Sequence, residues 1–254
     1  MITLPPLLRF LPLALMATAA LAAGVIGGLF FVKRSGDRRA NLIYGTLLLA
    51  AGLTQFHFLF DFAGWPARWP GLRFLPTYFT LWLPVLLFFW VKVRLYPEYR
   101  LRWTDAKHLA LPLAQLLFFA GRWLVPEWRG PAAGRSFYSP FYGGLEQALY
   151  LIYWPLYLFF SYQYFRRKRA ALNRPVLPRL LWYIRKLLKG CGLFVLAYAI
   201  LALGDFVSFK YLNADLRGQA WYAALQSLTF SILVYWLSTF GFQILLWGRK
   251  LLRG

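Results

Sequence analysis

The chain has very few of the residues that build metal centres and disulfides, with one cysteine, Cys191, and two histidines, His57 and His108. A single cysteine excludes an internal disulfide and a multi-cysteine metal site. Two histidines exclude a tris-histidine centre, and their predicted positions at opposite membrane faces exclude a shared metal or haem. No glycine-rich phosphate loop is present, and no lysine lies at mid-depth of an apolar stretch for a retinal Schiff base. The sequence therefore predicts no cofactor and no enzymatic centre.

Acidic residues are scarce as well. Eight Asp and Glu stand against 29 Lys and Arg, which gives a formal net charge of +21. In a soluble chain this charge would suggest nucleic acid as a partner. A soluble globule is excluded, however, because 60% of the residues are hydrophobic, 20% are aromatic and the mean hydropathy is +0.51. We therefore expect a polytopic membrane protein without direct nucleic-acid contact.

Seven apolar stretches are long enough to cross a hydrocarbon core of roughly 30 Å, which takes about twenty helical residues. They are residues 11–32, 40–62, 75–93, 106–125, 144–165, 187–206 and 221–247. The first has small residues at 16–24, like the end of a signal peptide, but its apolar run continues to Val32. We expect an uncleaved first helix. The predicted fold is all-α, a single seven-helix transmembrane bundle over residues 1–254.

The basic residues are distributed unevenly between the two predicted sides of the membrane. The loops after the first, third and fifth stretches, together with the C-terminal tail, hold 21 of the 29, and the other side holds eight. Loops rich in Lys and Arg stay in the cytoplasm. This pattern predicts that the N-terminus faces out and the C-terminus faces in, in the bacterial inner (cytoplasmic) membrane.

The longest polar break, residues 165–190, carries nine Lys and Arg and no acid. After Pro178, apolar residues recur at helical spacing with basic residues between them, which is typical of a basic amphipathic helix. Such a helix would contact anionic lipid headgroups or a protein partner. The alternative is a cytoplasmic overhang of the next membrane helix. The candidate contact residues are Arg166, Arg167, Lys168, Arg169, Arg185 and Lys186.

Small residues recur in the first stretch, where Ala20, Gly24 and Gly28 are spaced every fourth position. They would share one helix face, on which a neighbouring backbone could approach closely. We expect this face to pack inside the bundle. A homodimer seam is the alternative.

Polar residues gather at one predicted level, the outer third of the membrane. They are His57, Asp61, Arg122, Glu146, Asp205 and Gln226. Ionisable groups within a bilayer are costly and often functional. The functional interpretation is a vestibule, open to the outside, that binds a polar or cationic ligand. The alternative is a hydrated interface in which Asp61 or Glu146 pairs structurally with Arg122.

Two stretches, residues 81–119 and residues 38–41, have features found together in a known protein family. Residues 81–119 combine a helix containing Pro84, an aromatic-rich end at 88–90, a short basic loop at 96–107, and His108 close to Pro112; an Arg-Arg-Ala-Asn step lies at 38–41. In these features the chain resembles the seven-helix membrane region of certain bacterial AraC-type transcription regulators. In that family a domain with two helix-turn-helix units follows, whereas this sequence stops at Gly254. The resemblance thus implies a free-standing sensory membrane module, and it supplies no ligand or site residues.

Two function classes remain. The first is a sensory or signalling module that couples an external ligand or condition to a cytoplasmic or membrane protein partner. The second is a structural or transport subunit of a larger membrane complex. An enzymatic alternative, a membrane hydrolase using His57, Asp61, Asp205 and Ser208, lacks the histidine pair that such zinc sites usually need.

Overall fold

The computed structural model describes residues 6–33, 37–69, 72, 74–96, 98–125, 144–171, 177–212, 214, 216 and 219–253. Within these ranges the chain is helical and contains no strand, so the all-α prediction is confirmed. The elements are α1 (Pro6–Val32), α2 (Arg38–Phe62), α3 (Trp65–Arg68), α4 (Trp82–Leu95), the 3-10 helix η2 (Trp103–Leu109), α5 (Ala110–Leu124), α6 (Gly144–Ala171), α7 (Leu177–Tyr211) and α8 (Ala220–Arg253).

Four helices in the described ranges are long and apolar enough to cross a membrane. They are α1 from Phe10, α2, α7 from Leu180 and α8 over Trp221–Leu246. Their outward-facing apolar side chains fit this setting, since residues such as Leu21, Val25, Leu193 and Ile200 are exposed. The chain is therefore a membrane protein by its composition and helix lengths.

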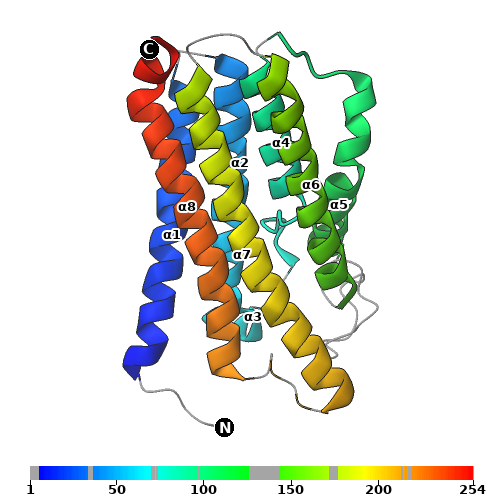
Figure 1. The fold of residues 1–254 in the computed structure, drawn as a ribbon. Coiled ribbons are helices and arrows are strands. Elements are labelled where there is room, and N and C mark those ends of the chain that lie inside the picture. Colours follow the sequence, from blue (N-terminus) through cyan, green and yellow to red (C-terminus); the bar gives the residue numbers. More distant parts are fainter. Residues whose placement is uncertain are drawn as a thin grey trace.

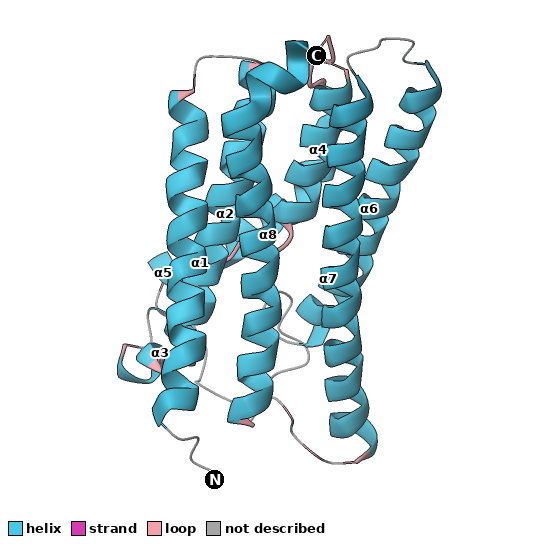
Figure 2. Ribbon diagram, turned by 60° about the vertical axis from the view of Figure 1, so that its left-hand side comes forward, coloured by secondary structure: helices cyan, strands magenta, loops and turns pink. Residues whose placement is uncertain are grey.

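The long helices run roughly along one axis, as Figures 1 and 2 show. Helix α2 packs against α1, α4 and α8, while α4 also packs against α6, and α7 fills the space between α6 and α8. The start of α1 and the end of α8 lie at opposite ends of the bundle (Figure 1). Helix α2 begins at a capped turn, because a side-chain oxygen of Asp37 accepts hydrogen bonds from the N–H groups of Arg39 and Ala40.

The close contact between α1 and α2 uses a neighbouring face to the predicted one. A Cβ added to Gly27 would lie 3.2 Å from the Gly45 carbonyl oxygen, so the two backbones nearly touch there. Around Gly24 and Gly28, in contrast, an added Cβ would meet nothing within 4 Å. The buried residues of α1 include Ala19 and Ala23, each one position before a residue of the predicted set. The predicted face borders this contact, because a Cβ added to Gly52 of α2 would lie 3.2 Å from the Ala20 carbonyl oxygen and 3.4 Å from the Gly24 nitrogen.

Helix α4 is shorter than the predicted span 75–93, because it begins at Trp82. Its 14 residues reach about 21 Å, less than the membrane core. Almost every α4 side chain is buried, and Figure 1 shows the helix in the half of the bundle that holds the C-terminus. Residues 74–81 precede it without forming an α-helix, and Tyr78, Thr80 and Leu81 among them are buried. We call residues 74–81 the interrupted segment.

Helix α7 is continuous from Leu177 to Tyr211, 35 residues or about 52 Å. The basic amphipathic stretch therefore continues directly into the apolar helix, as the overhang interpretation requires. Gly190 of α7 lets α8 approach closely, because a Cβ added to Gly190 would lie 2.2 Å from the Trp236 indole nitrogen.

The predicted span 106–125 is divided between two elements. Its first residues belong to the 3-10 helix η2, and α5 begins at Ala110.

Candidate functional site

The interrupted segment is held by buried polar side chains from two neighbouring helices. The Thr54 hydroxyl of α2 accepts a hydrogen bond from the Phe79 N–H at 2.9 Å. From α5, Gln115 accepts from the Leu81 N–H at 3.2 Å and donates to the Thr80 hydroxyl at 2.9 Å. Buried backbone outside an α-helix has neither helical partners nor water to bond with, so other parts of the protein must supply the partners. Thr54 and Gln115 are fully buried for this reason.

His57 lies beside the same segment. Its side chain is buried, its ring packs 5.1 Å from that of Tyr78 and 6.0 Å from that of Phe119, and Nδ1 lies 3.4 Å from the Thr77 hydroxyl. These contacts join α2, the interrupted segment and α5. The histidine thus sits in an aromatic wall with one polar contact to the interrupted segment.

The other predicted vestibule residues lie on α2, α5, α6, α7 and α8. Arg122 on α5 is half-buried, with its guanidinium 4.8 Å from the Phe118 ring centroid and 5.3 Å from that of Phe74. Asp61 is exposed at the end of α2. Asp205 is fully buried on α7.

Gln226 on α8 is linked to the backbone of α7 through Tyr222. Its amide donates to the Tyr222 hydroxyl at 3.4 Å, and that hydroxyl donates in turn to the Leu201 carbonyl. Helix α7 packs against α6 and α8, whereas α5 packs mainly against η2. Whether these side chains share one vestibule with Asp61, Arg122 and Glu146 stays a prediction. Glu146 lies in α6, but its side chain is outside the described residues.

A second polar cluster lies at the C-terminal end of α4. The Lys92 ammonium lies 3.2 Å from a carboxylate oxygen of Asp105 and donates to the Tyr99 hydroxyl at 2.6 Å. Tyr99 donates to Asp105 at 2.5 Å, and the Arg102 N–H donates to the same carboxylate at 2.8 Å. The Lys92 ammonium also lies 4.1 Å from the Tyr99 ring centroid. We call these four residues the Lys92 network.

The electrostatics of the Lys92 network favour a charged carboxylate. Burial of Asp105 by itself raises its pKa, but the hydrogen bonds from Tyr99, the Arg102 N–H and Lys92 outweigh burial and hold the pKa below the ordinary value. Burial and the hydrogen bond to Asp105 raise the pKa of Tyr99, which keeps its proton. The network therefore fastens the loop after α4 to α4 itself by an ion pair.

His108 extends this end of the bundle to α6. Its Nδ1 lies 2.7 Å from the Tyr157 hydroxyl, and the Tyr153 hydroxyl donates to the His108 carbonyl at 3.0 Å. The rings of Phe88 and Phe89 on α4 lie 5.6 and 5.9 Å from the histidine ring. Helices α4 and α6 and the 3-10 helix η2 are thereby tied at one point.

Four of the predicted surface contact residues have described side chains, and we call these four the basic rim. Arg166, Arg167, Arg185 and Lys186 are exposed, and Lys186 lies 5.0 Å from the Trp182 ring centroid. Lys168 and Arg169 lie in α6, with side chains outside the described residues.

Sequence reasoning missed the residues that hold the interrupted segment, Thr54, Thr80 and Gln115, and the pairing of Lys92 with Asp105. A signal for the first existed in the run Pro76-Thr77-Tyr78-Phe79-Thr80, which is polar for the start of a membrane helix. Within the described residues, no three His, Cys, Asp or Glu side chains come together as metal ligands would. The absence of a metal in the whole protein stays a prediction.

Comparisons with known proteins give no relative. No protein-family model, no curated protein and no solved structure matches the chain.

Proposed function

We propose that the protein is a membrane-embedded sensory module that couples the outer half of the bundle to its cytoplasmic end through α4. The observation that carries this proposal is the position of α4 between two polar assemblies. At its start lies the interrupted segment, held by Thr54 and Gln115, and at its end lies the Lys92 network. A buried, continuous helix moves as one body. A change in the hydrogen bonds at its start would therefore reach the loop at its end.

Seven crossings, with the N-terminus outside, fit the helix lengths. Besides the four long apolar helices, α6 has 28 residues, or about 42 Å. The 3-10 helix η2 and α5 together reach about 36 Å. Helix α4 and the interrupted segment together would form one further crossing. This arrangement agrees with the distribution of basic residues and with the resemblance to the AraC-type membrane regions. The proposed setting is a bacterial inner membrane, with no catalytic centre and with a cytoplasmic or membrane protein as output partner.

A transport or structural subunit is the second candidate, and the interrupted segment is the observation in its favour. Discontinuous helices near the middle of the membrane form substrate and ion sites in many transporters. In such a protein the hydrogen bonds of Thr54 and Gln115 would shape a permeation site and would have no required link to the Lys92 network. The two candidates thus differ in whether the ends of α4 are coupled.

Topology can be tested by reporter fusions. Fusions after residues 36, 172 and 254 are expected to report cytoplasm, and fusions near residues 132 and 213 the outside, because of the uneven distribution of Lys and Arg. An external signal from the fusion at 172 would contradict the proposed orientation.

Coupling along α4 can be tested by hydrogen–deuterium exchange of the purified protein. Thr54→Val removes the acceptor of the Phe79 N–H, and we expect faster exchange in residues 96–109 as well as in the interrupted segment. The matched control is Thr46→Val on the same helix, because the exposed Thr46 hydroxyl bonds only the Leu42 carbonyl one turn before it. Faster exchange confined to the interrupted segment would favour the transport or structural candidate.

A further inference from the structure

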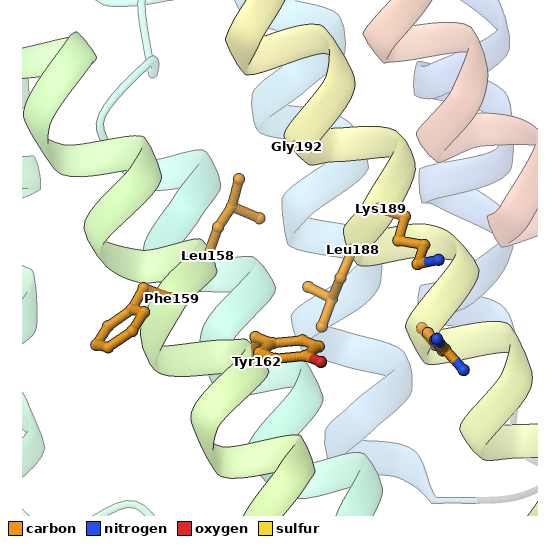
Figure 3. A pocket seen from close by; sticks show the side chains of 7 residues that line it. Leu158, Phe159, Tyr162, Leu188, Lys189 and Gly192 are labelled. Atoms are coloured by element: carbon orange, nitrogen blue, oxygen red, sulfur yellow. The ribbon is translucent and has the colours of Figure 1, made fainter.

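A groove runs between α6 and α7, near the end of the bundle where the basic rim lies. Its volume is about 260 Å³, and its apolar lining includes Leu158, Phe159, Leu188 and Gly192. Figure 3 shows the Tyr162 ring extending from α6 toward α7, next to Leu188. The groove is open on one side, so a long, thin apolar group could lie along it from the membrane.

Cations border the groove on α7. Arg185 and Lys189 both line it and are exposed, and they are four residues apart, so they lie one above the other on one helix face. Tyr162 adds a hydroxyl from α6. Together these side chains present two positive charges and a hydrogen-bond donor beside an apolar channel.

The charge of Arg185 and Lys189 is not compensated by acids of the two helices that form the groove. The acid of α6, Glu146, is sixteen residues before Tyr162, and the acid of α7, Asp205, is sixteen residues after Lys189. Either separation is about 24 Å along a helix, beyond the screening length of roughly 8 Å at physiological ionic strength. An anion at this place would meet a positive field.

We propose that the groove between α6 and α7 binds one anionic phospholipid, with its phosphate on Arg185 and Lys189 and an acyl chain along Leu158 and Leu188. A lipid is the occupant that fits, because the polar and apolar parts of the groove are arranged as in a phospholipid and the basic rim with Trp182 and Tyr162 is typical of the headgroup level. The proposal rests on the proposed topology only in assigning the lipid to the cytoplasmic leaflet. Lipid binding to the detergent-solubilised protein can be measured whether or not that topology is correct.

The test is native mass spectrometry of the full chain in detergent, titrated with phosphatidylglycerol and, separately, with phosphatidylcholine. Wild type is expected to bind phosphatidylglycerol preferentially. Arg185→Gln combined with Lys189→Gln should weaken this binding about thirtyfold, since each cation near an anionic headgroup contributes roughly fivefold. The control, Arg100→Gln with Lys107→Gln, removes the same charge from exposed residues between α4 and α5, outside the lining, and should change binding little.

A steric variant tests the apolar half of the site. An added Cβ at Gly192 would meet nothing within 4 Å, so Gly192→Leu fills the groove without disturbing the helix contacts. It should displace the lipid while the circular dichroism spectrum and the melting temperature without added lipid stay those of wild type. Equal losses in the two charge variants, equal binding of phosphatidylcholine, or displacement of the lipid by inorganic phosphate alone would each overturn the proposal.

Discussion

Asp105→Ala is expected to lower the free energy of unfolding by about 3 kcal/mol, because it leaves the largely buried Lys92 ammonium without its counter-charge. The same change removes the acceptor of the Tyr99 hydroxyl and of the Arg102 N–H. The loss can be measured as a shift of the denaturant midpoint in detergent. The double variant Lys92→Met with Asp105→Leu should lose less stability than the sum of the two single variants, because it removes both charges and leaves neither of them unpaired.

The control for this effect is Glu98→Gln, in the same loop. Glu98 is exposed and accepts a long, 3.5 Å hydrogen bond from Tyr96, so neutralising it should change stability by less than about 0.5 kcal/mol. The pH dependence has a definite sign. Since the folded pKa of Asp105 lies below its ordinary value, its stabilisation is complete above that value and is lost as the pH falls through the folded pKa. A wild-type protein with the same acid sensitivity as Asp105→Ala would contradict the ion pair.

Gln115→Leu should also be strongly destabilising, by about 2–5 kcal/mol. It leaves the Leu81 N–H without its acceptor and the Thr80 hydroxyl without the donor from Gln115, and a buried polar group that loses its partner costs roughly 1–3 kcal/mol. Leucine has nearly the volume of glutamine, so the effect of a cavity is small. Thermal unfolding in detergent measures the loss.

The matched control is Gln226→Leu, the same substitution on α8. The Gln226 amide makes a long, 3.4 Å hydrogen bond from a half-buried position, and we expect a loss below about 1 kcal/mol. Equal stability of the two leucine variants would show that Gln115 does not hold the interrupted segment.

Individual polar residues were hardest to interpret from sequence. The sequence predicts a vestibule that includes His57 and Arg122, and the structure shows contacts of both with aromatic side chains. Asp205 lies on α7 and Gln226 on α8, and the shared vestibule stays a prediction. Sequence spacing gives the depth of a residue in a membrane helix well. It gives the direction of the side chain only when the neighbouring helices are known.

The interrupted segment shows why the span 75–93 was predicted too long at its start. Average hydrophobicity favours a membrane helix through Leu75 to Leu81, and Pro76 and the polar residues after it oppose this only weakly. The alternative backbone becomes stable only because Thr54, 25 residues earlier, and Gln115, 34 residues later, supply hydrogen bonds to it. Such long-range partners leave no periodic pattern in the sequence.

The sequence by itself determined the membrane class, the all-helical fold and the approximate positions of the long helices, because apolar length and the cost of unpaired backbone in lipid act locally. Tertiary structure decided which face of α1 meets α2, where α4 begins, and that Lys92 is paired with Asp105. Each of these depends on contacts between segments whose relative rotation is fixed only when the helices pack, and a rotation of one residue, about 100°, exchanges a buried face for an exposed one.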